Sequence, residues 1–224
     1  LGLQAEARHD QATAERCLLE AARVARTFQP RWTLANYYFR RNDFGKFWRW
    51  ARQAAELVYG DATPLFRLCW HVTPDARAIL ERAVPAKTAV LEQYLRFLAA
   101  EDQLAGAEPV AERLVETADG RQVGTVLSYC DRLLEQGQVE PALQAWNGLA
   151  RRGLIGPGPL APDRGLSLSN GAFSSDPLGQ GFDWRIPATE GVSVARGEPA
   201  GTLRVAFAGQ QPEPDYASLR KAMV

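Results

Sequence analysis

The feature that most constrains the fold is a pattern of small, bulky and turn-forming residues that repeats along residues 1–150. In each copy a small residue is followed by a bulky one, a turn residue, and then small or apolar residues at helical spacing. The two clearest copies are Leu34-Ala35, Tyr38, Asn42, Phe47, Ala51 and Ala54, and Cys130, Leu133, Gly137, Ala142, Trp146 and Leu149. A half-copy, Ala14, Leu18 and Ala21, lies 33 positions before Phe47, Ala51 and Ala54. The pattern predicts antiparallel helix pairs that must stack to bury their apolar faces.

This repeat resembles that of the tetratricopeptide repeat family, in its period and in its order of small, bulky and turn residues. The resemblance covers about residues 1–150. It implies a mainly α fold, a right-handed α-solenoid of helical hairpins, followed by a short C-terminal β-rich segment. The stretch 60–90 departs from the pattern. Thr63-Pro64 and Thr73-Pro74-Asp75 there are typical of helix starts, because the fixed φ of proline suits a first helical turn. We expect shortened helices in this stretch.

Glycine and proline become frequent from residue 153 onwards. Residues 1–152 contain 14 of them, and residues 153–224 contain 19 in fewer than half as many positions. Proline removes a backbone donor and glycine favours turns, so neither helix nor strand is expected to cross this point. The sequence therefore predicts a helical repeat domain at 1–152, a Pro/Gly-rich linker at 153–168 and a β-rich segment at 169–224.

Three stretches of the last part alternate in residue type, as half-buried strands do: 166–173, 182–186 and 203–207. They resemble the opening strands of a carbohydrate-binding-module-like or galactose-binding-like β-sandwich. In that family an Asn-Gly-x-Phe entry, which begins here at Asn170, precedes the first core strand. A β-sandwich has about 100 residues or more, so we expect this segment to be an incomplete one.

Charge and cysteine content argue against several classes of function. Lys plus Arg and Asp plus Glu both number 26, and a net charge of zero argues against a nucleic-acid partner. No long apolar window is present, which predicts no membrane span in this sequence. Three dispersed cysteines and two histidines form neither a disulfide framework nor a metal-ligand spacing. With no catalytic motif either, we expect no enzyme activity, no catalytic or metal-binding residue and no cofactor.

Trp32, Asn36 and Arg40 are spaced four apart and so share one face of a predicted helix. In the tetratricopeptide repeat family the corresponding face lines the inner groove. The resemblance implies a partner-binding groove in which Asn36 hydrogen-bonds a peptide backbone, Arg40 pairs with a carboxylate and Trp32 offers a flat apolar platform. We expect a non-enzymatic scaffold that binds a protein or peptide partner there. The alternative is a solvated face without a ligand.

Nine aromatic side chains lie among basic residues in the stretch 28–50. Such a mixture can stack the bases of single-stranded nucleic acid. The aromatics occupy inter-helix positions, however, so a role in the helical core is the favoured interpretation.

The second candidate function is polysaccharide recognition in a bacterial cell envelope, with carbohydrate contacts from Phe182, Trp184 and Arg185. Aromatic rings stack on sugar faces in sandwiches of this kind, although the position of Trp184 in a predicted strand also suits a core role. This function implies a bacterial periplasmic or cell-envelope protein, with the present sequence as one part of a longer chain. The scaffold function leaves the compartment open.

Overall fold

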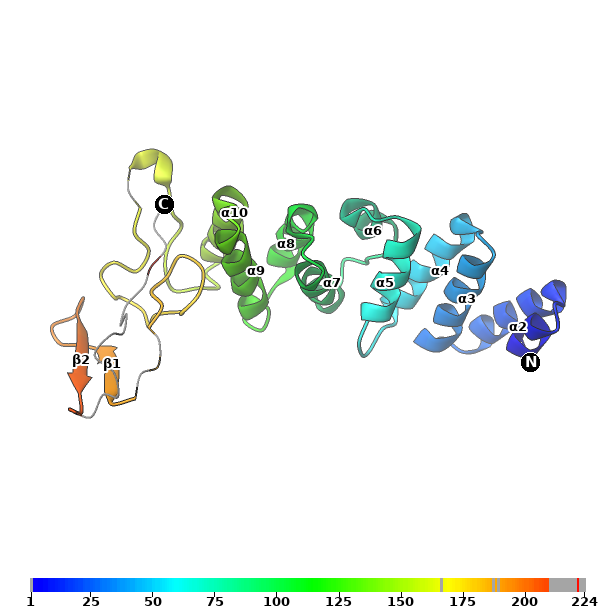
Figure 1. Cartoon of the computed structure of the whole chain (residues 1–224), viewed down its shortest axis with the longest axis horizontal. Helices are drawn as coiled ribbons and strands as arrows, with labels where there is room; N and C mark the ends of the chain where they lie inside the picture. Colours follow the sequence, from blue (N-terminus) through cyan, green and yellow to red (C-terminus); the bar gives the residue numbers. More distant parts are fainter. Residues whose placement is uncertain (1, 166, 187, 189, 210–220, 222–224) are drawn as a thin grey trace. The chain divides into compact units, whose positions relative to one another are not determined.

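The computed structural model of the chain describes residues 2–165, 167–186, 188, 190–209 and 221 (Figure 1). The fold is mainly α, as predicted. Within the described residues, ten α-helices pack in neighbouring pairs, and a two-stranded antiparallel sheet lies towards the C-terminus. The chain forms two compact units, Leu1–Leu114 and Val115–Val224. No helix in the described part is both long and apolar enough to cross a bilayer.

The first unit consists of short helices joined by tight turns. Its elements are α1 (Gly2–Ala7), α2 (Gln11–Val24), α3 (Phe28–Arg40), α4 (Phe44–Glu56), α5 (Thr63–Val72), α6 (Ala76–Arg82), α7 (Thr88–Ala100), the 3₁₀-helix η1 (Leu104–Gly106) and most of α8 (Glu108–Thr117). α1 packs on α2, and α3 packs on α4 (Figure 1).

Aspartate caps begin the second helix of the first three pairs. The carboxylates of Asp10, Asp43 and Asp75 accept hydrogen bonds from backbone N–H groups three residues on, at 3.1, 3.1 and 3.0 Å. Each cap satisfies one of the donors that a helix start leaves unpaired. The predicted turn residues Asn42 and Gly137 both have a positive φ, of 56° and 71°, which ends the preceding helix. The turns of the repeat are therefore confirmed.

The repeat positions form the core of the first unit. Ala35, Ala51 and Ala54 are fully buried where α3 packs on α4, because alanine lets two helix backbones approach closely. Tyr38 and Phe47, at most 2% exposed, fill the space around them. The predicted pairing of these helices is confirmed.

The stretch 60–90 holds the shortened helices that the sequence predicts. α5 begins at Thr63 with Pro64 in its first turn, and α6 has only 7 residues. The second start lies at the end of the predicted Thr73-Pro74-Asp75 stretch, because Asp75 caps α6 and the helix begins at Ala76. Thr73 instead closes α5, and its N–H donates to the Cys69 carbonyl at 3.0 Å. A nearby aspartate therefore outcompetes the Thr-Pro pair as the cap.

The second unit contains one helix pair and a largely irregular segment. Its elements are α9 (Val123–Glu135), α10 (Val139–Arg151), the 3₁₀-helix η2 (Pro162–Arg164), β1 (Val192–Arg196) and β2 (Leu203–Phe207). The repeat positions Cys130, Leu133, Ala142, Trp146 and Leu149 are fully buried, as predicted. α10 ends one residue before the predicted end of the helical domain at 152. The division into 1–152, 153–168 and 169–224 stays a prediction.

Among the described residues, one of the three predicted strands is present. β2 matches the predicted strand 203–207, and it pairs with β1, with Val194 opposite Val205. The sequence did not predict β1. Within the described residues the sheet has these two strands, and a β-sandwich is not seen there. Leu166, at the start of the first predicted strand, lies outside the described residues.

In two of the predicted strands, residues 169–172 and 182 form turns and residue 183 forms a bend. The Asn170 side chain bonds both the N–H and the carbonyl of Ser175, at 3.2 and 3.0 Å. The Asp183 carboxylate accepts from the N–H groups of Leu178 and Trp184, at 2.9 and 2.8 Å. These side chains form hydrogen bonds with backbone groups that, in a strand, would pair with a neighbouring strand.

Residues 154–186 pack on the α9–α10 pair through polar and apolar contacts. The buried Asn147 amide donates to the Leu160 carbonyl at 2.9 Å and accepts from its N–H at 2.7 Å. Asp131 of α9 accepts from the Gly181 N–H at 2.7 Å. Trp146 meets Phe182 edge to face, with 5.9 Å between the ring centres. The irregular segment therefore covers the face of α10 that carries Trp146.

Alanine substitutions at two glycines, compared with each other, test this packing. Gly179 and Gly181 both have a positive φ, of 73° and 59°, so alanine at either costs about 1–2 kcal/mol in backbone strain. A Cβ at 181 would lie 2.7 Å from the Trp146 ring, whereas at 179 nothing lies within 4 Å. We expect Gly181→Ala to lower the free energy of unfolding by about 1–3 kcal/mol more than Gly179→Ala, measured by urea titration. Equal losses would contradict the contact with Trp146.

Candidate functional site

Trp32, Asn36 and Arg40 lie along one face of α3, as their spacing requires. The opposite side of α3 carries the buried Leu34, Ala35 and Tyr38. We call the surface of Trp32, Asn36 and Arg40 the α3 face. Arg40 is exposed, and Trp32 and Asn36 are partly exposed.

Arg40 is already engaged by a carboxylate of its own chain. Its Nε and Nη2 donate to the two oxygens of Glu6 in α1, at 2.9 and 2.8 Å. This fork-to-fork geometry is the strongest form of an Arg–carboxylate pair. The side chains remain 47% and 26% exposed. The sequence did not reveal this pair, which joins the first helices of two consecutive hairpins.

Asn36 makes a hydrogen bond within its own helix. Its Nδ2 donates to the Trp32 carbonyl at 2.9 Å. An asparagine side chain has two donors and one acceptor oxygen. The bond to Trp32 uses one donor and fixes the orientation of the amide along the α3 face.

Trp32 belongs to a cluster of three aromatic rings, which we call the aromatic ledge: Phe28, Trp32 and Tyr59. Trp32 stacks on Phe28, with ring centres 6.1 Å apart and planes at 12°. Tyr59, in the connection between α4 and α5, meets Phe28 edge to face at 6.5 Å and is 89% exposed. The four-residue spacing of Phe28 and Trp32 was a signal for their contact, whereas nothing in the sequence places Tyr59 beside them.

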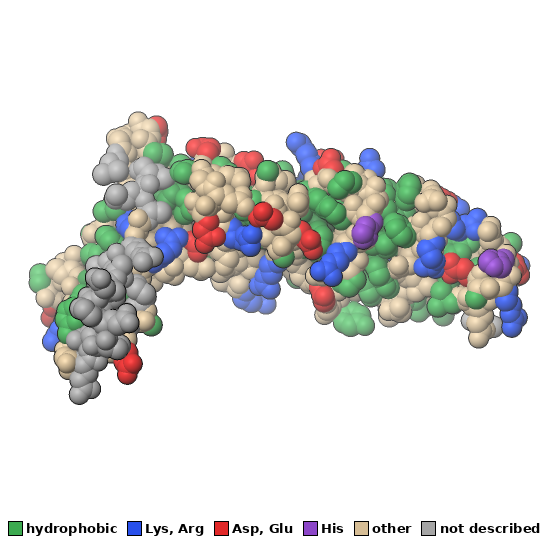
Figure 2. Space-filling view, in the orientation of Figure 1, with side chains coloured by type: hydrophobic (Ala, Val, Ile, Leu, Met, Phe, Trp, Pro, Cys, Tyr) green, Lys and Arg blue, Asp and Glu red, His purple; other side chains and the backbone are tan. Residues whose placement is uncertain are grey.

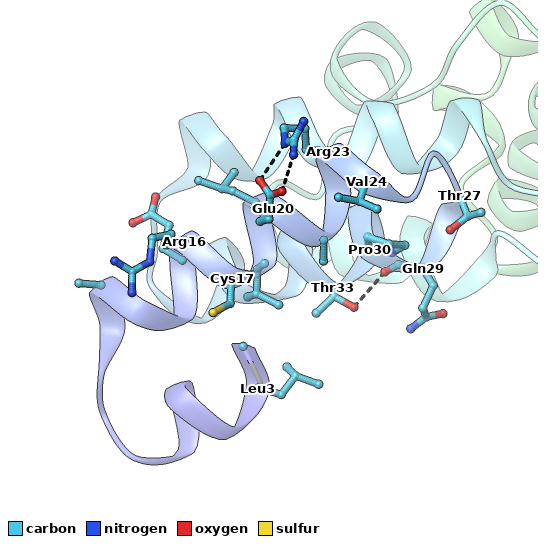
Figure 3. A pocket seen from close by; sticks show the side chains of 16 residues that line it. Leu3, Arg16, Cys17, Glu20, Arg23, Val24, Thr27, Gln29, Pro30 and Thr33 are labelled. Atoms are coloured by element: carbon cyan, nitrogen blue, oxygen red, sulfur yellow. Dashed lines mark hydrogen bonds and ion pairs between the residues drawn. The ribbon is translucent and has the colours of Figure 1, made fainter.

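A groove of about 1400 Å³ lies where α1, α2 and α3 meet (Figure 3). We call it the N-terminal groove. Leu18 and Ala21 of α2 line it together with Leu3, Val24 and Pro30. Charged side chains stand at its edge, where Arg23 donates to both carboxylate oxygens of Glu20, at 2.8 and 2.6 Å. Sequence reasoning missed this groove, because its residues come from three helices.

Charges of both signs are interspersed on the helices in the view of Figure 2. Green apolar side chains reach the surface between them. Among the described residues, no group of three or more His, Cys, Asp and Glu side chains lies close enough together to hold a metal ion.

The three residues proposed to contact carbohydrate take different partners. Phe182 is 1% exposed and packs on Trp146, so it contributes to the core. Arg185 forms an ion pair with Asp131 of α9. Trp184 is partly exposed, and its Nε1 donates to the Asn170 carbonyl at 3.0 Å. Of the three, Trp184 lines a cavity.

That cavity, of about 360 Å³, lies between the turns before β1 and the β1–β2 hairpin. Trp184 lines it together with Asp176 and Arg196, whose side chains form an ion pair at 2.8 Å. Lys221 also reaches Trp184, with Nζ 4.5 Å from the ring centre. Burial lowers the pKa of Lys221, against the attraction of the fully buried Asp183 carboxylate at 3.9 Å. Sequence reasoning missed Asp176, Arg196 and Lys221.

The three cysteines differ in accessibility, which gives a test of the fold and of the N-terminal groove. Cys69 and Cys130 are buried, and burial raises the pKa of both thiols, that of Cys130 to about 12. The sulfur of Cys17, which is only partly buried, points into the groove (Figure 3).

We expect a thiol reagent at pH 8 to modify Cys17 in the native chain, because the thiolate is the reactive form and must be accessible. Cys69 and Cys130 should react only after urea is added. Mass spectrometry of the modified peptides measures both. Rapid native modification of Cys69 would contradict the packing around α5.

No family model, no curated protein and no solved structure matches this chain.

Proposed function

We propose that the chain is a non-enzymatic scaffold that binds a protein or peptide partner on the α3 face. The observation that supports this most is the aromatic ledge, where Trp32 and Tyr59 stay accessible beside polar groups. Aromatic side chains with polar neighbours are the residues that dominate protein-binding surfaces. The paired helices support the proposal further, by analogy with the tetratricopeptide repeat family.

The α3 face also defines the chemistry of a suitable partner. Trp32 and Arg40 are eight residues apart on a helix, or about 12 Å. An extended peptide covers that length in about four residues. The partner that fits carries an apolar side chain for the ledge and a carboxylate about four positions away.

Arg40 can accept such a carboxylate in place of that of Glu6, because a partner's carboxylate can form the same two hydrogen bonds. Both side chains are partly exposed, so the pair is accessible to an incoming group. Replacing Glu6 by an acidic group of the partner therefore changes the free energy little.

The test is a pull-down from a lysate of the organism that encodes the chain. We expect Trp32→Ala to lose the retained protein, whereas Phe44→Ala keeps it. Phe44 is the matched control, since it is an aromatic residue of α4 that is 40% exposed and outside the ledge. Thermal melts should show similar stability for both variants. Retention of the same proteins by Trp32→Ala would contradict the α3 face as the binding surface.

A second pair of variants separates the role of Arg40 from that of its ion pair. We expect Arg40→Glu to abolish partner binding with little change in Tm, because an exposed ion pair contributes little to stability. Adding Glu6→Arg restores an ion pair with the charges exchanged. Binding should stay lost in this double variant, since the partner's carboxylate would still meet a glutamate. Binding that returns would show that the pair acts only on the position of α1.

We propose carbohydrate binding by the second unit as the alternative function. The cavity at Trp184 supports it, because an aromatic ring beside a carboxylate and a guanidinium suits the apolar face and the hydroxyl groups of a sugar. The Asn-Gly-x-Phe stretch at Asn170 adds the resemblance to carbohydrate-binding modules. A cell-envelope location belongs to this alternative.

Asp176→Ala tests this alternative without removing a core residue, because the Asp176 side chain is 84% exposed. On an array of bacterial polysaccharides, we expect the intact chain to bind a glycan that Asp176→Ala binds at least about tenfold more weakly, as the loss of a charged hydrogen-bond partner predicts. Asp163→Ala, a change at an exposed aspartate outside the cavity, is the control. Equal binding by both variants would contradict the cavity as the sugar site.

A further inference from the structure

The second unit contains a fully buried carboxylate, that of Asp183. It has no exposed surface, and its two oxygens accept from the N–H groups of Leu178 and Trp184 at 2.9 and 2.8 Å. These donors are neutral, so the negative charge of the group remains. A carboxylate that is buried in its ionised form requires a cation close by.

Lys221 supplies that cation. Its side chain is only 5% exposed, and Nζ lies 3.9 Å from a carboxylate oxygen of Asp183. Nζ also donates to the carbonyl and to the hydroxyl oxygen of Ser169, the latter at 3.1 Å. The centre of the Trp184 ring is 4.5 Å away, within the range of a cation–π interaction. Oxygen atoms and an aromatic ring therefore surround the amine.

The groups around the amine favour a charged hydrogen-bond donor. The Ser169 hydroxyl donates to the Phe182 carbonyl, so towards Lys221 it can only accept. The Ser169 carbonyl and the Asp183 carboxylate are acceptors as well, and the face of an indole ring attracts a positive charge. We call Ser169, Asp183 and Trp184 the ammonium site. It suits a cation with several N–H groups.

The shape of the site favours an ammonium over a guanidinium. The sequence has 23 arginines and 3 lysines, yet a lysine stands at 221. Both Ser169 oxygens, the Asp183 carboxylate and the centre of the Trp184 ring lie within 4.5 Å of a single atom, Nζ. A compact charge that carries three donors on one nitrogen can meet all of them, whereas the guanidinium spreads its charge over a wider plane.

The ammonium group also holds a ring that lines the cavity at Trp184. Lys221 and Phe173 both contact this ring, with 5.1 Å between the ring centres of Phe173 and Trp184, and neither residue lines the cavity. The hydrogen bond from Trp184 Nε1 to Asn170 is the third restraint. Loss of the cation would remove one of the three and would leave the charge of Asp183 unpaired next to Trp184 in the chain.

We propose that Ser169, Asp183 and Trp184 form a binding site for a primary ammonium ion, which Lys221 fills as an internal ligand. Its occupancy fixes the Trp184 ring at the wall of the cavity, so Lys221 is a positioning residue for a ligand bound there. The ammonium site itself stands independently of the functions proposed above. Its effect on a bound sugar rests on the proposed carbohydrate function.

A small amine can test the site in the full chain once the Lys221 side chain is removed. Lys221→Ala takes away Cγ, Cδ, Cε and Nζ, which n-propylammonium replaces. With nitrogen-15 in the tryptophan indoles, the Trp184 N–H signal, identified by its absence in Trp184→Phe, reports on the ring by NMR. We expect this signal to move in Lys221→Ala and to return as propylammonium is added, with a dissociation constant of about 1 mM.

Thermal melts extend the test to a variant that is partly unfolded. A ligand that binds the folded chain raises its Tm. We expect propylammonium to raise the Tm of Lys221→Ala, whereas the intact chain, in which Lys221 fills the site, should not respond.

A neutral ligand and two further variants are the controls. We expect 1-propanol, which has the size of propylammonium without its charge, to leave the Trp184 signal of Lys221→Ala unchanged. Lys221→Met fills the same space with an uncharged side chain and should not respond to propylammonium. Lys87→Ala removes the lysine that donates to the Glu56 carbonyl in the first unit, so its Trp184 signal should match that of the intact chain.

Glycan binding tests the positioning role separately. On the polysaccharide array, Lys221→Ala should bind the glycan of the intact chain about tenfold more weakly, and propylammonium should restore the binding. Equal binding by Lys221→Ala and the intact chain would overturn the positioning role. If the intact chain binds no glycan, the carbohydrate function fails, and the NMR and thermal measurements still decide the ammonium site.

Two outcomes would overturn the ammonium site itself. An unchanged Trp184 signal in Lys221→Ala would show that the amine does not hold the ring. Equal effects of 1-propanol and propylammonium on Lys221→Ala would show that the space left by the side chain accepts small molecules without selecting a cation.

Discussion

Close packing of helices at alanine positions is the constraint on which the rest of the structure depends. Ala35, Ala51 and Ala54 have no exposed surface in the packed α3–α4 pair, where their small side chains let the helices approach closely. Helix pairs built in this way leave one apolar face uncovered, and only a further element can bury it. Each pair therefore needs a neighbouring element that covers this face.

In the second unit this apolar face is covered by an irregular segment and not by a helix. Trp146 occupies a repeat position on α10, and Gly181 and Phe182 cover it. An irregular segment can do this only if its backbone polar groups find partners, since a buried unpaired group costs about 1–3 kcal/mol. Asn147 supplies both partners for Leu160, and Asp131 supplies one for Gly181. Polar side chains of the helices thus allow a non-repetitive chain to replace the next hairpin.

Features set by short-range interactions are predictable from the sequence, and features set by long-range interactions are not. The helix pairs were predictable because three- and four-residue spacing is a local property, and Asn42 and Gly137 marked the turns correctly. Alternation of residue type wrongly predicted strands at 169–173 and 182–184. Asn170 and Asp183 there bond neighbouring backbone groups, and the polarity of a residue does not show which backbone group it will bond. The Arg40–Glu6 pair joins residues 34 positions apart and depends on how two helices align. The N-terminal groove depends on three helices and had no linear signal.

The α3 face and the N-terminal groove both include residues of α3, and α1 takes part in both. α1 has six residues and is held at one end by the contact of Gly2 with Leu18 and at the other by the bond of Glu6 to Arg40. The first contact lies in the groove and the second on the α3 face. A ligand carboxylate that displaces Glu6 from Arg40 would release one of these two restraints. Binding on the α3 face and the position of α1 are therefore linked, and linkage requires the effect to be reciprocal.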